Sequence, residues 1–332
     1  MTVLPLRCLL LTAAVLAGAG EPIGIDRFDP RLDDVLAADA PITELSSGHQ
    51  WSEGPVWSAR LGGVLFSDVP RNRILLWTAT GGTRVWMERS GGVADQQGSN
   101  GLAFDREGRL VLCQHGARRV LRLETLAPDS ATTVLAVGAP GRAFNSPNDL
   151  HLAGDGSCWF TDPPYGLPAG TAPELALHGV WRVRAGTTAA ELMIGELRYP
   201  NGIAMAPDER TLYVAISDRD HPRIMAYPLS ATGAPGPGRI LLDARPLRAA
   251  GRPGSCDGLK VDRHGVLFAT GPGGVLVIAP DGTLLGLIRT GSATANVAFG
   301  EADGGTLFIT AKDRLLRVRT RTTAARWSAH AH

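Results

Sequence analysis

The stretch NGIAMAPDERTLYVAISD, residues 201–218, alternates apolar and polar side chains, turns at a Pro-Asp pair, and then alternates again. Alternation with a period of two on both sides of a turn predicts a β-hairpin. Including this stretch, six related ones begin at Glu53, Asn100, Asn148, Asn201, Asp257 and Asn296, with spacings of 47, 48, 53, 56 and 39 residues. The mean of roughly 49 residues matches the length of one β-propeller blade.

The first repeat shows how each blade is built. Apolar alternation predicts strands near residues 53–58, 63–69, 72–78 and 83–88, with Gly- and Pro-containing turns between them. Four short antiparallel strands make one blade, so we expect an all-β, six-bladed β-propeller with four-stranded antiparallel blades around a central channel. The last repeat has one clear strand after Ile309, near 314–319, and Ile42–Ser46 is expected to complete that sheet. A β-sandwich with coincidental turn spacing is the alternative.

The first residues have the pattern of a targeting segment. Arg7 precedes the apolar run 8–17, and Ala17-Gly18-Ala19 offers the small residues that a signal peptidase requires. We therefore expect a signal peptide over 1–19, a lead-in over 20–39, the propeller domain over 40–320 and a tail over 321–332. This organisation implies a secreted or periplasmic protein without a membrane span. A buried N-terminal helix is the alternative for the first segment.

Composition excludes some partners and says little about others. The formal net charge of +1 gives no electrostatic reason to expect a nucleic-acid partner. Cys113, Cys158 and Cys256 are an odd number outside the expected signal peptide, and a disulfide framework is not expected in a chain of this size. We expect Cys113 and Cys158, which lie within predicted strands, to behave as small hydrophobic residues.

One point of the repeat is expected to face the channel, because the innermost strands of a propeller line it. The residues at this point all carry side-chain oxygens: Glu53, Asn100, Asn148, Asn201, Asp257 and Asn296. Two carboxylates with several amide carbonyls suit a hard divalent cation such as Ca²⁺, Mg²⁺ or Mn²⁺. A single Asn-Gly or Asp-Gly pair would only mark a turn, but the recurrence in six repeats favours a ring-shaped metal site.

The chain resembles the family of gluconolactonases, senescence marker protein (regucalcin) and luciferin-regenerating enzymes. The stretches that carry the resemblance run in order from Trp51 to Arg319: EGPVW, FSDVPRNRILLW, NSPNDL, FTDPPYGL, YPNGIAMAPDERTLYVA, CDGLKVDRHGVLFATGPGGVLVIAPDG and NVAFG. The resemblance implies a six-bladed propeller that hydrolyses sugar lactones with one divalent ion on its axis. Ca²⁺ is the first expectation, and Zn²⁺, Mg²⁺, Mn²⁺ and Fe²⁺ are the alternatives.

The resemblance also assigns roles to residues. It implies Glu53, Asn148, Asn201 and Asp257 as metal ligands, Asp257 as the catalytic acid/base, and Asn148 also as a substrate contact. Three positions depart from the family pattern. Ser146 stands where animal members have Arg, Gln114 stands where the bacterial motif has Glu, and Cys256 stands where Pro is more usual.

The remaining pocket residues are expected to contact substrate. Asn100 belongs to the ring, His115 lies one strand inside the second repeat, and Tyr165 follows Asp162 in FTDPPYG. His115 as a hydrogen-bonded structural histidine, and Asp162 and Tyr165 as turn residues beside two prolines, are the alternatives. Asp68 and Asp218 are interpreted as caps at strand ends.

Lactone hydrolysis requires a polarised carbonyl, an activated water and a stabilised oxyanion. A divalent ion would supply the polarisation, and Asp257 would take a proton from water and return it to the leaving alkoxide. Because a cation weakens a bound carboxylate as a base, Asp257 could instead be only a ligand, with the ion itself activating the water. No GxSxG sequence indicates a serine hydrolase. The competing functions are an arylesterase or strictosidine-synthase-like enzyme, and a non-enzymatic calcium- or ligand-binding propeller.

Overall fold

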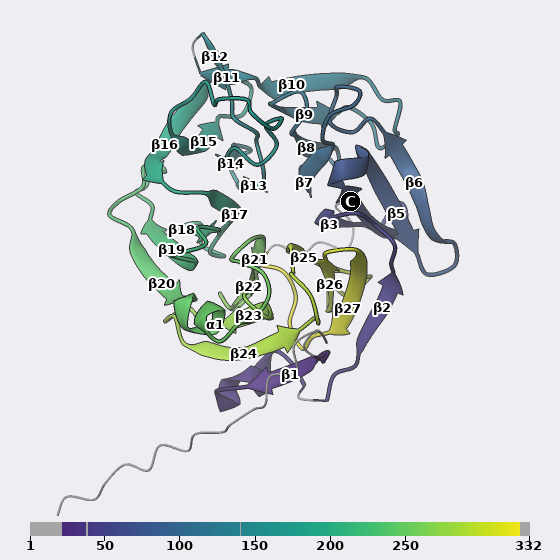
Figure 1. Ribbon diagram of the computed structural model, residues 1–332, viewed down its shortest axis with the longest axis vertical. Coiled ribbons are helices and arrows are strands. Elements are labelled where there is room, and N and C mark those ends of the chain that lie inside the picture. Colours follow the sequence, from purple (N-terminus) through teal and green to yellow (C-terminus); the bar gives the residue numbers. More distant parts are fainter. Residues whose placement is uncertain (1–21, 38, 140, 326–332) are drawn as a thin grey trace, which may run out of the picture.

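The computed structural model describes residues 22–37, 39–139 and 141–325. Over these ranges the chain is nearly all β, and its sheets stand around a central channel as six blades (Figure 1). The predicted six-bladed β-propeller is therefore confirmed. The expected signal peptide and residues 326–332 of the expected tail lie outside the described residues. No helix in the described part of the chain is long and apolar enough to span a membrane.

Each blade is an antiparallel sheet whose strands run outward from the channel in chain order. Blade one is β3 (Ser52–Ser58), β4 (Gly63–Asp68), β5 (Arg73–Thr78) and β6 (Gly82–Glu88), and blade two is β7 (Ser99–Phe104), β8 (Leu110–Gln114), β9 (Arg119–Leu123) and β10 (Thr132–Ala136). Blade three is β13 (Leu150–Leu152), β14 (Cys158–Asp162), β15 (His178–Val183) and β16 (Ala190–Leu197), and blade four is β17 (Pro200–Met205), β18 (Thr211–Ile216), β19 (Arg223–Pro228) and β20 (Arg239–Asp243).

The last two blades each include a strand from the start of the chain. Blade five is β21 (Leu259–Val261), β22 (Leu267–Gly271), β23 (Gly274–Ile278) and β24 (Leu284–Arg289), with β1 (Gly24–Arg27) added outside β24. Blade six is β25 (Asn296–Gly300), β26 (Thr306–Ala311), β27 (Arg314–Arg319) and β2 (Ile42–Ser46). Short connecting elements are η1 (Pro30–Asp34), η2 (Val69–Arg71), α1 (Arg245–Ala249), β11 (Gly138–Ala139) and β12 (Arg142–Ala143).

The ring closes as predicted. β2 pairs antiparallel with β27, with Ile42 opposite Val318 and Glu44 opposite Leu316. This pairing joins both ends of the propeller in one sheet and covers the edge that β27 would otherwise expose. The segment expected as a lead-in also contributes structure, because β1 pairs with β24 and Leu32 is buried against blades five and six.

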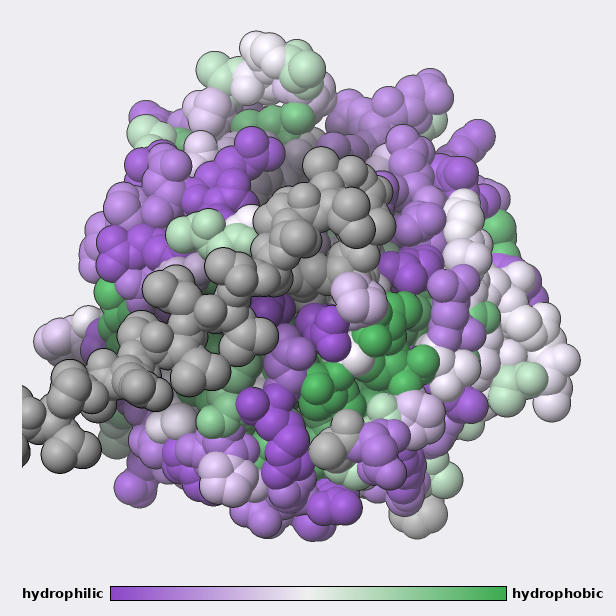
Figure 2. Space-filling view, turned by 60° about the horizontal axis from the view of Figure 1, so that its bottom comes forward, coloured by the Kyte–Doolittle hydropathy of each residue, from purple (hydrophilic) through white to green (hydrophobic). Residues whose placement is uncertain are grey.

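The hydrophobic core lies between the blades. Six clusters of buried apolar residues occupy the six blade interfaces in the described part of the chain. Cys113 and Cys158 are buried as free thiols between blades two and three, in agreement with their predicted role as small hydrophobic residues. The face seen in Figure 2 is largely hydrophilic, and its largest group of hydrophobic residues lies near the centre. Because the sheets pack face to face around the axis, their inner strands hold the channel residues in fixed positions.

Candidate functional site

One mouth of the channel opens into a cavity of about 620 Å³. Except for Asn296, the residues predicted to bind metal or substrate line it: Glu53, Asn100, His115, Asn148, Tyr165, Asn201 and Asp257. They come from blades one to five, where each innermost strand begins, and from the loops after β8 and β14. The structure thus brings together side chains that are far apart in the sequence.

Main-chain hydrogen bonds between neighbouring blades define the ring of channel positions. The N–H groups of Gly101, Gly202 and Gly258 donate to the carbonyls of Asn148, Asp257 and Ala295, at 2.8, 3.1 and 2.7 Å. Ala295 therefore occupies the ring position of blade six. The prediction that Asn296 completes the ring is wrong by one residue, because strand pairing aligns Ala295, not Asn296, with the ring residues of the other blades.

Asn296 instead contributes to a second layer below the ring. Its Nδ2 donates to Oδ2 of Asp149 at 3.2 Å, so the two side chains join blades three and six and form a floor beneath the ring. The other four blades have glycine in this layer. A Cβ on Gly258 would lie 2.0 Å from Cγ of Asn296, and one on Gly101 would lie 2.7 Å from Oδ1 of Asp149. The glycines leave the space that this floor occupies.

The carboxylates of the ring are strongly perturbed. Glu53 is buried, and desolvation followed by the charge of Asp149 raises its pKa to about 7, although the Gly54 N–H donates to its Oε2 at 3.1 Å. Asp257 is partly exposed at the mouth, but its Oδ1 is buried without a partner. Desolvation and the charge of Glu53 raise the pKa of Asp257 well above its ordinary value. Carboxylates crowded in this way favour a bound cation.

The amide side chains also offer oxygens to the cavity. The Oδ1 atoms of Asn100 and Asn148 are buried and have no hydrogen-bond partner. Nδ2 of Asn201 donates to Oγ of Ser217 at 3.0 Å, and that hydroxyl donates to the carbonyl of Cys256 at 2.6 Å, which leaves the Asn201 oxygen available. Buried oxygen acceptors without donors fit a hard divalent cation.

The structure describes no cluster of three or more His, Cys, Asp and Glu side chains that could hold a metal ion. A cation at the ring would therefore depend on amide oxygens in addition to the two carboxylates. Such a set of carboxylate and amide oxygens suits Ca²⁺. Sites for Zn²⁺ are typically rich in thiolate and imidazole ligands instead.

Two further predicted residues form the cavity wall. His115 is buried, and its Nδ1 lies 3.0 Å from Oε1 of Gln97. Tyr165 is exposed at the mouth and stacks on Tyr199 with 5.8 Å between ring centroids. Desolvation raises the pKa of the Tyr165 hydroxyl, so it stays protonated and can donate a hydrogen bond at neutral pH.

Several wall residues were missed by the sequence reasoning. Gln97, Ser217, Arg219 and Arg248 all line the same cavity. Ser217 occupies in blade four the position of His115 in blade two, since their N–H groups donate to the carbonyls of Tyr199 and Gly98, two residues before Asn201 and Asn100. Residue types at such loop and strand-end positions differ between blades, so the repeat pattern gave no signal for these four residues.

The aspartates and the serine noted in the sequence have structural roles. Asp162 accepts hydrogen bonds from the backbone N–H groups of Asn145 and Ser146, each at 2.8 Å. Oγ of Ser146 accepts from the Gly166 N–H at 2.8 Å and thereby holds the loop that carries Tyr165. Asp218 accepts from the Asp220 N–H at 3.1 Å, as expected of an Asx turn, whereas Asp68 accepts from the distant Gln50 N–H at 3.0 Å and so ties two segments together instead of capping its own strand end. Ser146 therefore acts on the site through this loop.

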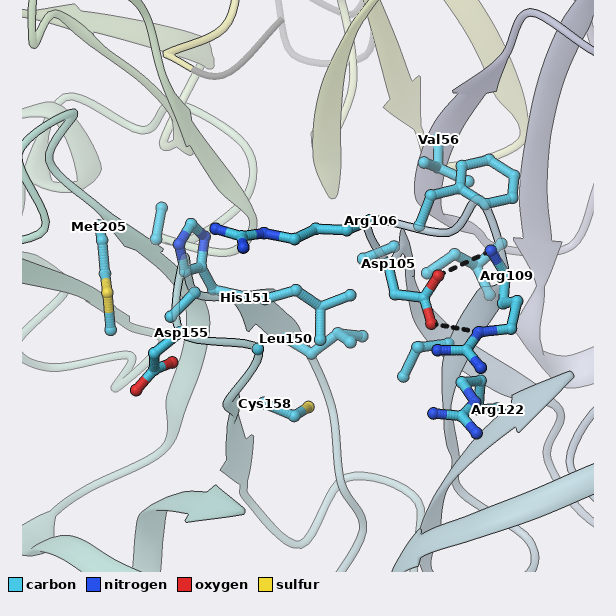
Figure 3. A pocket seen from close by; sticks show the side chains of 18 of the residues that line it. Val56, Asp105, Arg106, Arg109, Arg122, Leu150, His151, Asp155, Cys158 and Met205 are labelled. Atoms are coloured by element: carbon cyan, nitrogen blue, oxygen red, sulfur yellow. Dashed lines mark hydrogen bonds and ion pairs between the residues drawn. The ribbon is translucent and has the colours of Figure 1, made fainter. Parts of the chain in front are cut away.

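A larger cavity, about 930 Å³, opens at the opposite mouth of the channel (Figure 3). Its walls include apolar residues such as Val56 and Met205, and Arg106 extends across it toward His151. Several of its charged groups are already neutralised, as in the ion pair between Asp105 and Arg109 at 2.7 Å. It lacks the ring of unpartnered oxygen acceptors, so its greater volume does not make it the better candidate for chemistry.

Comparison with known proteins agrees with this geometry. The model of the SMP-30/gluconolactonase/LRE-like region matches residues 51–313. A gluconolactonase from Zymomonas mobilis is 37% identical over 340 residues, which cover 96% of this chain and 94% of that relative.

Solved structures show the same similarity. A gluconolactonase from Xanthomonas campestris is 32% identical with a TM-score of 0.79, covering 92% of this chain and 99% of that one. A calcium-binding protein, regucalcin, from Agrobacterium tumefaciens has a TM-score of 0.65 over 86% of this chain and 97% of its own. At 19% identity, that last likeness concerns the fold alone.

Proposed function

Because this chain belongs to the SMP-30/gluconolactonase/LRE-like family, we propose that it hydrolyses the ester ring of a sugar lactone to the aldonic acid with the help of one divalent cation. The names of its relatives support the substrate class, since the proteins from Zymomonas mobilis and Xanthomonas campestris are both gluconolactonases.

One observation in the structure carries the proposal. Two carboxylates with raised pKa values converge with buried, unpartnered amide oxygens on a single solvent-connected cavity. Such groups are costly to bury, and they persist where a ligand compensates for the cost. A purely structural ring would be expected to satisfy these oxygens within the protein.

The residues of the ring fit a cation. Glu53, Asn148, Asn201 and Asp257 would hold it, and Ca²⁺ is the ion we expect from the all-oxygen donor set. When bound, the cation supplies Lewis-acid polarisation of the lactone carbonyl. The negative charges of Glu53 and Asp257 would balance its two positive charges.

The chain's own groups complete the reaction. Asp257 takes a proton from the attacking water as the water oxygen bonds to the carbonyl carbon. The bond between that carbon and the ring oxygen then breaks, and Asp257 returns the proton to the departing alkoxide. Asn148 orients the substrate beside this carboxylate, and Tyr165 closes the outer side of the cavity.

Acid release from glucono-δ-lactone, corrected for spontaneous hydrolysis, tests the proposal. Activity should be lost after chelation and return with Ca²⁺. Asp257→Ala and Asp257→Asn separate the roles of the carboxylate. If both variants lose the metal, Asp257 is mainly a ligand. If Asp257→Asn keeps the metal but its rate falls by about 10²–10⁴, Asp257 is the base. Arg106→Ala at the opposite mouth is the control and should leave activity unchanged.

Three outcomes contradict parts of the proposal. Activity that is unaffected by chelation excludes the cation from the reaction. Cation binding without lactone hydrolysis identifies a non-enzymatic binding propeller. Hydrolysis of aryl esters but not of lactones identifies an arylesterase on the same fold.

A further inference from the structure

The wall of the ring cavity contains a pair of side chains that the proposed reaction does not use. His115 follows β8, and Gln97 lies in the loop before β7. Nδ1 of His115 lies 3.0 Å from Oε1 of Gln97, whereas Nε2 of His115 is buried without a hydrogen-bond partner. We propose that this pair recognises a ring hydroxyl of the substrate, with Nε2 of His115 as the acceptor and Gln97 as the residue that positions it. The inference rests on the proposed lactonase function.

The hydrogen bond to Gln97 determines the tautomer. An amide oxygen can only accept, so Nδ1 of His115 must carry the proton. Burial lowers the pKa of His115 to about 4, and the imidazole is therefore neutral at physiological pH. Its Nε2 then carries an unpaired lone pair on a side chain that lines the cavity. Such an atom accepts from a hydroxyl and offers nothing to a carbonyl or an ether oxygen.

The surrounding backbone holds the imidazole in place. The His115 N–H donates to the Gly98 carbonyl and the Gly116 N–H donates to the Gln97 carbonyl, each at 3.1 Å. On its other side the ring packs against Gly166, where a Cβ would lie only 2.5 Å from Cγ of His115. Because the imidazole of His115 is held in place, its Nε2 accepts a hydrogen bond only from a ligand whose donor lies at the matching position.

The consequence is selectivity for hydroxylated lactones. A polyhydroxylated lactone can satisfy Nε2, but an unsubstituted lactone of the same ring size leaves it unpaired in a buried wall. Sites built to pair with a ligand hydroxyl discriminate strongly against analogues that lack it. Tyr165 and the ring amides line the same cavity, but none of them pairs with Nε2 of His115.

The kinetic test compares glucono-δ-lactone with δ-valerolactone. His115→Phe should lower the ratio of their kcat/KM values about tenfold, equivalent to about 1.4 kcal/mol, mainly through the KM for the hydroxylated lactone. Gln97→Leu should lower the ratio in the same direction, and Gln97→Glu, which keeps an acceptor for Nδ1–H, should restore it. Thermal melts verify that each variant folds, and Arg106→Ala serves as the control from the opposite mouth.

A second measurement does not depend on activity. Long-range ¹H–¹⁵N spectra, with the His115 signals assigned from their loss in His115→Asn, should show the Nδ1–H tautomer in the wild type. The non-hydrolysable ring analogue 1,5-anhydroglucitol should shift the Nε2 signal, whereas tetrahydropyran, which has no hydroxyls, should not.

The two kinds of failure are distinguishable. If the wild type hydrolyses neither lactone, the proposed function fails, and the spectra still decide whether the pair recognises a hydroxyl. An Nε2–H tautomer, equal shifts with both ring analogues, or an unchanged kinetic ratio in folded His115→Phe and Gln97→Leu would overturn the inference.

Discussion

The glycine that follows Asn201 gives a sharp test of the channel geometry. A Cβ on Gly202 would lie 2.2 Å from the carbonyl oxygen of Asp257 and 2.7 Å from Cα of Gly258. Both atoms belong to the backbone of the next blade, so no change of rotamer relieves the contact. The two inner strands are also tied together there, because the Gly202 N–H donates to the same carbonyl at 3.1 Å. Gly202→Ala must therefore push blade four away from blade five.

The expected magnitude follows from the contact. Ordinary van der Waals separation requires a displacement of about 1 Å, and overpacking of a dense core costs about 1–3 kcal/mol. We expect the upper end, about 3 kcal/mol, because only backbone can move. For a chain of this size that is a decrease in Tm of roughly 4 °C. The same displacement moves Asp257, and a shift of about 1 Å in an active group lowers the rate by about 10².

Urea unfolding and lactone hydrolysis measure the two effects. The matched control is Gly195→Ala in the outer strand β16, where the nearest contact of a Cβ is a Leu192 methyl at 3.2 Å. That side chain can yield, so the control should lose less than about 1 kcal/mol and keep its activity. If both variants unfold alike and hydrolyse lactone alike, the close packing of inner strands does not position Asp257.

Three other predictions concern the ring, the wall and the start of the chain. Asn148→Ala should cost about 1 kcal/mol or less in a thermal melt, yet lower lactone hydrolysis by about 10²-fold, and parental turnover with normal metal binding would make Asn148 a bystander. Burial holds the pKa of His115 near 4, so the unfolded chain binds a proton that the folded protein rejects, and stability falls as the pH decreases from about 6.5 to 4. Urea unfolding with chelator present measures this effect. Between pH 6.5 and 4 the free energy of unfolding should decrease by about 3 kcal/mol less in His115→Asn than in the wild type, and equal decreases in both proteins would contradict the low pKa. Export with cleavage near Ala19 should appear in the intact mass of secreted material, which a mature chain that retains Met1 would refute.

The blades could be predicted because their signals are local. Apolar alternation and turn residues recur in each repeat, and they located the strands of blade one to within a few residues of β3 to β6. The pairing of Ile42–Ser46 with β27 followed from counting, since blade six was one strand short. The addition of β1 to blade five had no such signal, because that sheet already had four strands.

The ring could be predicted only in part. Five of its positions coincide with the repeated polar residue, but the sixth was misplaced because Asn296 resembles the other asparagines in type. Strand register decides the matter, since the N–H groups of Asp257 and Ala295 donate to the carbonyls of Thr270 and Thr310 in the same way. Residue type alone cannot determine register when two adjacent residues both lie near the axis.

The ring residues and the wall residues of this cavity differ in how clearly the sequence reveals them. An oxygen-bearing ring residue recurs in five of the six blades, so the repeat itself reveals the ring, and the glycines that follow four of these residues indicate that something occupies the layer below. That occupant is the hydrogen-bonded pair Asp149 and Asn296, which joins blades three and six beneath the ring. Gln97 and His115 lie outside the ring, at positions where the residue type changes from blade to blade, as from His115 in blade two to Ser217 in blade four, and only the fold brings this pair together. A propeller can thus keep the reactive ring constant and change its substrate through single wall residues.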